Sequence, residues 1–210
     1  MLITGDTLTV HAARHKPTSA DPLAPDPPAA TASEPSDESL LDRMRSRDTA
    51  ALDALVGRWS RVLMRTAWLT LGDAHAADDA VQQTFIAAWD GARRTTPQTP
   101  VRGWLFAILI NQCRRRQRSA GRRRRREEAA ARPERVEPGP HTDTEIELER
   151  MRRALLRLTP PLREVVVLRF QQGLSVDDTA AALGIAEGTV KSRTHSAMAE
   201  LRRRLTGETP

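Results

Sequence analysis

The chain has 210 residues, enough for one medium-sized domain or two small ones, and carries a formal net charge of +6. No apolar run approaches the roughly 18 residues that a membrane-spanning helix needs, and the first residues lack the basic and apolar segments of a secretion signal. Cys113 is the single cysteine, which excludes an internal disulfide framework and a cysteine-rich zinc site. We therefore expect a cytoplasmic protein without membrane insertion.

The charge is distributed unevenly along the chain. Residues 113–126, the arginine cluster, hold nine arginines and no acidic residue. Residues 127–149 are predominantly acidic, and residues 150–210 are basic again. Basic charge concentrated in short segments is typical of proteins that bind nucleic acid.

The N-terminal segment is rich in proline, alanine, serine and threonine. Six of the fourteen prolines lie within residues 17–35. Such a segment cannot bury enough apolar surface to offset the entropy lost on ordering, so residues 1–36 are predicted to be disordered.

Apolar residues recur at helical spacing in three stretches of residues 37–119, which predicts a first helical domain. The first stretch follows Asp48, a suitable N-cap, and the second follows Gly72 and Asp73. The third follows a polar loop over residues 91–100 and ends in the arginine cluster. The three stripes are Leu52, Leu55, Val56, Trp59, Val62, Leu63 and Thr66; Ala77, Ala80, Val81, Thr84, Phe85, Ala88 and Trp89; and Val101, Trp104, Leu105, Ile108 and Gln112.

Residues 120–144 combine glycine, prolines and a switch from basic to acidic charge, which predicts a flexible charged linker. A second helical domain is predicted over residues 145–207. The short run Val165–Leu168 is strand-like, but its spacing with Leu162 and Phe170 favours a helix. The predicted fold class is all-α: two small helical domains on a flexible linker, preceded by a disordered tail.

Residues 173–205 have the pattern of a helix-turn-helix. Ser175 can cap a short helix, with Asp178 three residues later. Gly184 suits a left-handed turn, and Ile185 places an apolar side chain between the two helices. The apolar face of the next helix consists of Val190, Thr194, Ala197, Met198, Leu201 and Leu205.

The outward face of that last helix is polar and basic, as a recognition helix in the major groove requires. An ordinary helical hairpin with solvated charges is the alternative interpretation, but the turn glycine, the apolar plug and the basic face occur in the order of a DNA-binding motif. Arginines 202–204 are placed for phosphate contacts. The candidate DNA contacts near its N-terminus are Glu187, Thr189, Lys191, Ser192, Arg193 and His195.

Two sets of motifs point to one family. The stretches Gly72-Asp73, Ala77–Trp89 and Val101–Asn111 resemble region 2 of the sigma-70 family, in its extracytoplasmic-function (ECF) subfamily, and Leu158–Leu205 resembles region 4. Both sets occur in the family's order and spacing. The resemblance implies a transcription initiation factor that binds core RNA polymerase, directs it to specific promoters and helps to melt the −10 region. It implies no cofactor and no enzymatic activity.

The resemblance also implies roles for particular residues and partners. The region 4 candidates named above would read the −35 element, and Trp104 would either stack on an unpaired base or belong to the core. Further implied partners are the β flap of the polymerase and an anti-sigma factor. The implied contacts to the β′ clamp helices are Asp78, Asp79, Gln82 and Gln83. The implied contacts to the −10 element are Arg102, Trp104, Asn111, Arg114, Arg115 and Arg118.

Some features depart from the family or favour other classes. Ala186 stands where the family usually has a serine, which removes a helix cap worth about 1 kcal/mol. A helix-turn-helix regulator that acts without polymerase, with residues 37–119 as a sensor or dimerisation domain, is the alternative function. An enzyme is a third class, but the chain has no glycine-rich phosphate loop and its histidines form no metal-ligand set. These histidines are His11, His15, His75, His141 and His195.

Overall fold

The computed structural model describes residues 35–96, 100–127 and 143–206, with the side chains of residues 122–127 and 143–145 left out. The regular elements in these ranges are all helical, which confirms the all-α prediction. The predicted disordered tail lies outside the described residues apart from Pro35 and Ser36. The elements are α1 (Asp37–Arg45), α2 (Thr49–Leu71), α3 (Ala74–Gly91), η1 (Ala92–Arg94), α4 (Val101–Glu127), α5 (Asp143–Leu156), α6 (Pro160–Val166), η2 (Val167–Gln171), α7 (Val176–Leu183) and α8 (Glu187–Thr206).

Helices α1 to α4 form the N-terminal unit, and their ends follow from local sequence. The Asp48 carboxylate accepts the N–H groups of the first turn of α2, as predicted, and Asp73 does the same for α3. Gly72 ends α2 with φ of 77°, a left-handed conformation that glycine adopts without a steric penalty. The sequence pattern had not predicted α1 as a separate helix. Ser36 caps its N-terminus by accepting the N–H of Ser39. Its buried side chains are Leu40, Leu41 and Met44.

The core of the N-terminal unit lies between α2, α3 and α4. Trp59 packs edge-on against Phe106, with ring centroids 6.0 Å apart, and donates its indole N–H to Asp37 at 3.1 Å. Leu55, Leu63 and the other core positions of the predicted stripes are buried, which fits the helical spacing. The edge positions of the α2 stripe, Leu52, Val56 and Val62, are only partly buried.

Helix α4 runs through the arginine cluster, where the sequence placed its end, and extends into the predicted linker. It continues to Glu127, and α5 begins at Asp143, so both edges of the predicted linker over residues 120–144 are helical. Arginine has a high helix propensity, and one glycine, Gly121, costs only about 1 kcal/mol in a helix interior. The remaining linker residues, 128–142, lie outside the described residues.

Helices α5 to α8 form the C-terminal unit, which contains the predicted helix-turn-helix. The Ser175 hydroxyl accepts the N–H of Asp178 at 3.0 Å and donates to its carboxylate at 2.7 Å, which confirms the predicted cap. Gly184 ends α7 with φ of 66°, and Ile185 is half-buried against the core. The turn glycine and the apolar plug are therefore confirmed.

Five large apolar side chains among the described residues of this unit are exposed: Ile146, Leu148 and Met151 of α5, Phe170 of η2 and Met198 of α8. Met198 was predicted on the inward face of α8, and this prediction was wrong because it is 38% exposed. It lies one residue, about 100° around the helix, from the buried Ala197. Phe170 is 52% exposed, although the run Val165–Leu168 before it is helical, as predicted.

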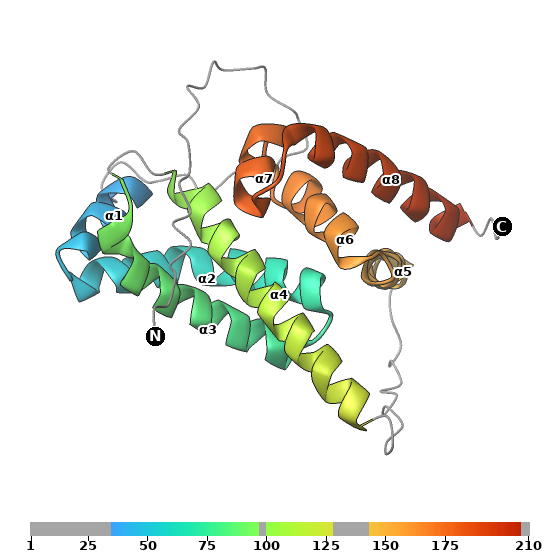
Figure 1. The fold of residues 1–210 in the computed structure, drawn as a ribbon, viewed down its shortest axis with the longest axis horizontal. Coiled ribbons are helices and arrows are strands. Elements are labelled where there is room, and N and C mark those ends of the chain that lie inside the picture. The colour runs from blue at the N-terminus through green and yellow to red at the C-terminus, as the bar shows by residue number, and fades with distance from the viewer. Residues whose placement is uncertain (1–34, 97–99, 128–142, 207–210) are drawn as a thin grey trace, which may run out of the picture.

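The two units share one apolar core. Helix α7 packs against α4, while α6 and η2 pack against α2, so the C-terminal unit covers one side of the N-terminal helices (Figure 1). One continuous cluster of buried side chains joins Leu105 and Ile110 of α4 to Val165, Leu168 and Leu183 of the C-terminal unit. The charge and hydropathy patterns had given no signal for this contact.

Buried polar groups cross the same boundary. Arg163 of α6 is 9% exposed and donates to the carbonyl of Thr70 in α2 at 2.6 Å and to the carbonyl of Leu158 at 2.8 Å. Burial lowers the pKa of this guanidinium, which is partnered by carbonyl oxygens of both units. Gln172 donates to the hydroxyl of Thr66 at 2.8 Å. These buried bonds fix the register of the two units.

Candidate functional site

The first candidate surface is the outward face of α3. Asp78, Asp79, Gln82 and Gln83 are all exposed, while the opposite face of the helix is buried. The Gln82 amide donates to the Asp78 carboxylate at 2.8 Å, and Asp79 forms an ion pair with Arg116 of α4. The face therefore offers carboxylate and amide groups to a partner that carries positive charge and hydrogen-bond donors.

Sequence reasoning missed one member of this face. Ile86 is 53% exposed and lies three residues after Gln83, so it continues the same face by one turn. An exposed isoleucine beside polar groups gives the face an apolar contact of the kind found inside protein interfaces. Asp79, Gln82, Gln83 and Ile86 are spaced three or four residues apart, as residues on one helix face are. This spacing could have identified Ile86 from the sequence.

The second candidate surface is α4, and here the predicted residues divide into two groups. Asn111, Arg115 and Arg118 are exposed. Arg102 and Arg114 are half-buried and contact the C-terminal unit. The α4 side chains predicted to act together therefore differ in exposure, since two of them are bound by the C-terminal unit.

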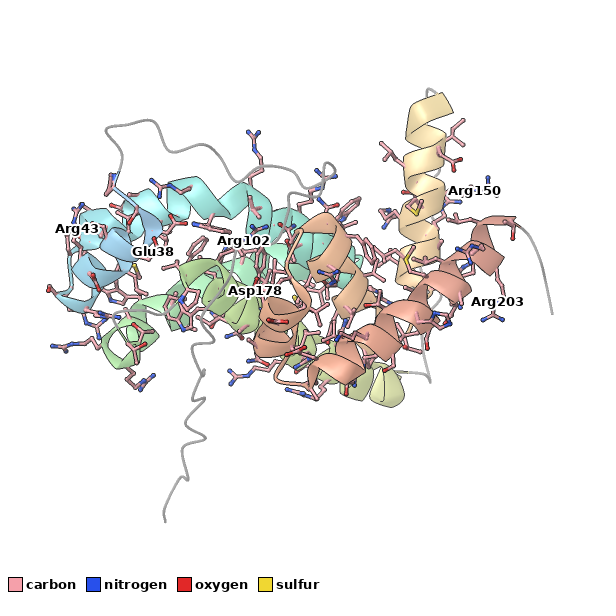
Figure 2. All side chains as sticks on the ribbon, turned by 90° about the horizontal axis from the view of Figure 1, so that it is seen from above. Glu38, Arg43, Arg102, Arg150, Asp178 and Arg203 are labelled. Carbon is pink, nitrogen blue, oxygen red and sulfur yellow. The ribbon has the colours of Figure 1, made fainter. Side chains whose placement is uncertain are left out.

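The contacts of Arg102 and Arg114 are specific. Arg114 donates from Nε and Nη2 to the two carboxylate oxygens of Glu164 in α6, at 2.9 and 2.7 Å, and Nη1 also reaches the Leu183 carbonyl at 3.4 Å. Arg102 donates to the carbonyl of Gln172, and Figure 2 shows it next to Asp178 of α7. Burial lowers the pKa of Arg102, and the nearby Asp178 partly offsets this effect.

Trp104 packs largely as a core side chain. It is half-buried, lies against the core cluster, and its ring is next to Gly91 at the end of α3. This position favours the core interpretation over a freely exposed stacking platform. Part of the residue remains accessible to solvent.

The faces of α3 and α4 meet in a polar groove. This groove has a volume of about 810 Å³. Asp79 and Gln83 line it from α3, and Arg115 and Arg116 line it from α4. Two surfaces that the sequence assigned to different tasks are thus adjacent, with the Asp79–Arg116 ion pair between them.

The third candidate surface is the N-terminal half of α8. Glu187, Lys191, Ser192 and His195 are exposed, whereas Thr189 and Arg193 are half-buried. Lys191 is 3.9 Å from the Glu187 carboxylate, with both side chains more than half exposed, so the pair is weak and its groups are available to a ligand. The N–H groups of Thr189 and Val190 are donated to the Ala186 carbonyl, so the helix starts there without a side-chain oxygen at that position.

An apolar groove lies between α2 and the C-terminal unit. It has a volume of about 1110 Å³. Trp68 of α2, Met151 of α5 and Phe170 of η2 line it and are 37%, 45% and 52% exposed. Arg152 lies over the Trp68 ring, 4.9 Å from its centroid. The basic residues around the groove are Arg61, Arg65, Arg152 and Arg153.

Chemically reactive groups are scarce in the part of the chain that the structure describes. Burial raises the pKa of the Cys113 thiol to about 12, so it is a poor nucleophile. Among the described side chains no group of three or more histidine, cysteine or acidic residues could hold a metal ion. None of the described helices is long and apolar enough to cross a membrane.

The arrangement of a four-helix unit with an acidic outward face and a helix-turn-helix unit defines a class of transcription factor. Family models match residues 55–123 as Sigma-70 region 2 and residues 148–201 as Sigma-70 region 4. The chain belongs to the ECF subfamily of RNA polymerase sigma factors, which are transcription initiation factors and not catalytic enzymes.

Particular relatives support this membership. The ECF RNA polymerase sigma factor SigM of Mycobacterium tuberculosis is 39% identical over 173 residues, covering 82% of this chain and 86% of the relative. A structure of CnrH in complex with the cytosolic domain of CnrY is 29% identical with a TM-score of 0.63, covering 82% of this chain and 99% of CnrH. A structure of the sigma factor RpoE in complex with the anti-sigma factor NepR from Bartonella quintana is 27% identical with a TM-score of 0.64, covering 75% of this chain and 98% of RpoE.

Proposed function

We propose that the α3 face, made of Asp78, Asp79, Gln82 and Gln83, binds the β′ clamp helices of core RNA polymerase. The single observation that carries this proposal is that all four side chains are exposed on a helix whose other face is buried. Exposed polar residues that do not serve the core are free to serve a partner, and Ile86 adds apolar contact area beside them.

The α4 and α8 surfaces are proposed to contact the promoter. Asn111, Arg115 and Arg118 are exposed for the −10 element, together with Arg102 and Arg114 once these leave their present partners. Trp104 would stabilise this surface from the core side. On α8, Lys191, Ser192 and His195 would read the −35 bases, with Arg193 on a phosphate. Glu187 and Thr189 would complete this surface, and the C-terminal unit would also contact the β flap.

These roles need no catalytic group and no cofactor from this chain. The protein would act in the cytoplasm, where the polymerase and the chromosome are, and its promoter selectivity would come from binding energy alone. A helix-turn-helix regulator without polymerase contacts remains the alternative, and it predicts no role for the α3 face.

The decisive experiment measures competition for core polymerase against a labelled second sigma factor. The variant Asp79→Arg with Gln82→Ala should lose at least about tenfold in affinity, because it reverses one charge and removes one hydrogen-bonding group at a polar interface. Unchanged affinity would contradict the docking assignment and favour the alternative regulator.

Two control variants separate docking from other effects. Asp53→Arg makes the same charge reversal on an exposed position of α2 and should leave core binding unchanged. Arg116→Ala removes the ion pair with Asp79 without reversing the charge of the α3 face, and it should therefore cost much less than the double variant. Far-UV circular dichroism checks that each variant is folded.

The apolar groove between α2 and the C-terminal unit is proposed to bind an anti-sigma factor. CnrH and RpoE were each solved in complex with a partner protein, named as an anti-sigma factor for RpoE. The groove has an apolar floor with four arginines and Glu149 around it. Arg152 and Arg153 bind Glu149, so most of the positive charge comes from Arg61 and Arg65, which suits an amphipathic helix with acidic flanks. Phe170→Asp should abolish inhibition by the cognate anti-sigma factor in run-off transcription. Inhibition at the wild-type level would contradict the assignment.

A further inference from the structure

Two arginines at the end of α1 reach a segment much later in the chain. Arg45 is the last residue of the helix, and Arg47 lies in the turn that follows it. Their side chains donate to residues 42 to 51 positions later, at the end of α3 and just after η1. Helix α1 lies beside η1 in the fold (Figure 1). The buried side chains of α1 are all apolar, so the two guanidinium groups serve this distant segment and not the packing of α1 itself.

The Arg45 guanidinium binds the chain immediately after η1. Its Nε and Nη2 atoms donate to the Thr95 hydroxyl at 3.2 and 3.1 Å, and Nη2 also donates to the Thr96 carbonyl. Its Nη1 atom donates to Asp42 at 2.6 Å, which fixes the orientation of the guanidinium plane. The Thr95 hydroxyl in turn donates to the Ala92 carbonyl at 2.7 Å. Because the Arg45 side chain is only 20% exposed, these bonds are partly shielded from water.

Arg47 holds the chain just before η1. It donates to the Trp89 carbonyl at 3.3 Å, its guanidinium carbon lies 5.0 Å from the centroid of the Trp89 ring, and Asp90 is 3.9 Å away. Arg47 has φ of 63°, a left-handed conformation, and it is the one non-glycine residue with positive φ among those that the structure describes. Such strain persists where surrounding contacts hold the residue in place. Both ends of η1 are therefore fixed from α1 and the turn after it.

The segment between these two fixed points carries exposed basic groups. Arg93 and Arg94 are exposed, while Ala92 before them is buried. Within the described part of the chain, neither arginine has an ion pair or a side-chain hydrogen bond. The segment adjoins the start of α4, because Gly91 lies next to the Trp104 ring. Arginines without a protein partner, on a segment that is held at both ends, are suited to phosphate contacts beside the proposed −10 surface.

We propose that Arg45 is a positioning residue for binding of the −10 element, because it holds η1 where Arg93 and Arg94 meet the DNA backbone. This inference rests on the proposed −10 role of α4 and adds to it a residue of α1 that touches no DNA itself. Without the bonds from Arg45, η1 has more conformations in the free protein, and DNA binding must then order it. Loss of Arg45 therefore weakens the −10 contact and leaves the −35 contact and the fold intact.

Limited digestion with trypsin measures this positioning without DNA or polymerase. Trypsin cuts after arginine, and it cuts after Arg93 and Arg94 only when η1 leaves its held conformation. In the full chain, Arg45→Gln should raise the rate of cleavage at these two sites by about fivefold or more, as quantified by mass spectrometry. Arg43→Gln is the matched control, since it removes an ion pair between α1 and Asp48 that does not involve η1. The control should be cleaved at the wild-type rate, and equal rates in folded Arg45→Gln would overturn the proposal.

Thr95 tests the same contact from the other side and keeps the test valid if Arg45→Gln fails to fold. Thr95→Val removes the hydroxyl at nearly constant volume and should raise the cleavage rate as Arg45→Gln does. Thr95→Ser keeps the hydroxyl and should match the wild type. The double variant Arg45→Gln with Thr95→Val should show less than the product of the two single effects, because both changes break one contact. Two effects that multiply would mean that the side chains act separately, contrary to the proposal.

The functional test uses holoenzyme assembled from core polymerase and the full chain. Two probes are taken from a promoter that the wild-type holoenzyme selects from a random library: a duplex with the −35 element alone, and the same duplex with a single-stranded −10 extension. The ratio of their affinities measures the −10 contact. Arg45→Gln should lower this ratio about fivefold and leave binding of the −35 duplex unchanged, which a general loss of stability would not do. Equal weakening on both probes overturns the positioning role.

Two further variants identify what Arg45 acts through. Arg93→Ala with Arg94→Ala should lower the same ratio and reduce its salt dependence by a slope of about one to two, as loss of phosphate contacts requires. Adding Arg45→Gln to this variant should lower the ratio no further, and a full additional loss contradicts the proposal.

The underlying −10 role of α4 is tested separately with Arg115→Ala and Arg118→Ala combined. If this variant keeps the full gain from the −10 extension, the proposed function of α4 fails. If it loses the gain while Arg45→Gln keeps it, only the role of Arg45 is overturned.

Discussion

The N-terminal and C-terminal units are both helical, but they are stabilised in different ways. The N-terminal unit has long helices around large, fully buried side chains such as Leu105, Phe106 and Ile110. The cluster that belongs to the C-terminal unit is small and centres on Leu158, Val167 and Leu201. The other buried apolar side chains of the C-terminal unit belong to the core shared with the N-terminal unit, namely Val165, Leu168, Leu174, Ala180, Ala182, Leu183 and Val190.

This difference indicates that the N-terminal unit is the rigid part of the molecule and the C-terminal unit the part that moves. A unit whose long helices surround large, fully buried side chains can hold a polymerase-binding face rigid, as the α3 face requires. A unit whose own cluster is small, and whose other buried apolar side chains lie in the shared core, is less stable apart, so it is the part expected to move. Because the core is shared, a change in the contacts between the two units is expected to change the position of α8 as well.

The largest expected effect comes from core truncations in the two units. Leu105→Ala removes a fully buried side chain from the N-terminal core and should lower the free energy of unfolding by roughly 3–5 kcal/mol. Leu201→Ala, at a position 6% exposed in the smaller cluster, should cost roughly 2–3 kcal/mol. Chemical denaturation followed by circular dichroism measures both values.

Fluorescence then shows which unit responds. The four tryptophans, Trp59, Trp68, Trp89 and Trp104, all lie in the N-terminal unit, whereas circular dichroism reports on both units. Leu105→Ala should shift both signals together. Leu201→Ala should shift the circular dichroism transition first and leave most of the fluorescence transition in place. Coincident transitions in Leu201→Ala would show that the two units unfold as one, against the division described above.

Most of the fold was predictable from local patterns. The caps at Asp48 and Ser175 and the turn at Gly184 depend on groups within a few residues, so the sequence displays them directly. Helix α1 was missed because its short stripe of Leu40, Leu41 and Met44 has too few repeats to stand out. Met198 was misplaced because a stripe at helical spacing spans about 100°, which is wider than the contact that α8 makes.

The candidate site was predictable in composition but not in arrangement. The exposed faces of α3 and α8 carry most of the residues that the motifs indicated, while Thr189 and Arg193 are half-buried. The contacts of Arg102 and Arg114 join residues fifty or more positions apart, and no periodic pattern encodes such a pair. Their partners, a backbone carbonyl and Glu164 in an apolar run, carried no motif of their own.

The next largest effect distinguishes base reading from phosphate anchoring on α8. Lys191→Ala or His195→Ala should change the preferred −35 sequence and cost roughly 1–3 kcal/mol at one or two base positions, because these exposed side chains lie in the first half of the helix. Replacing the exposed Arg202 and Arg203 by alanine should weaken binding to all sequences and flatten its salt dependence.

A binding-site selection measures the preferred sequence and the affinity of the Lys191→Ala, His195→Ala and Arg202/Arg203 variants. Arg204 is the matched control, because Glu200 already binds it, and Arg204→Ala should change DNA affinity less than loss of Arg202 or Arg203. A shifted consensus in the arginine variant, with an unchanged one in Lys191→Ala and His195→Ala, would mean that α8 enters the groove in the opposite direction.

The smallest expected effect is a pH-dependent contribution of Glu149 in the C-terminal unit. Hydrogen bonds and charge from Arg152 and Arg153 outweigh the opposing effect of burial and lower the pKa of Glu149 to about 2, from an ordinary value of 4.5. A carboxylate with a lowered pKa in the folded state stabilises the fold at pH values above 4.5, and this contribution disappears as the pH falls towards 2. Because the Glu149 side chain is 37% exposed, solvent screening limits the contribution to less than about 1 kcal/mol.

Glu149→Gln should therefore lower the free energy of unfolding slightly at pH 7, and the difference from the wild type should shrink between pH 4.5 and pH 2. Glu147→Gln is the control, since its carboxylate is 64% exposed and has an arginine, Arg150, at 3.7 Å, so a smaller change is expected at pH 7. A difference between Glu149→Gln and the wild type that stays constant down to pH 2 would show that the side chain acts through packing and not through its charge.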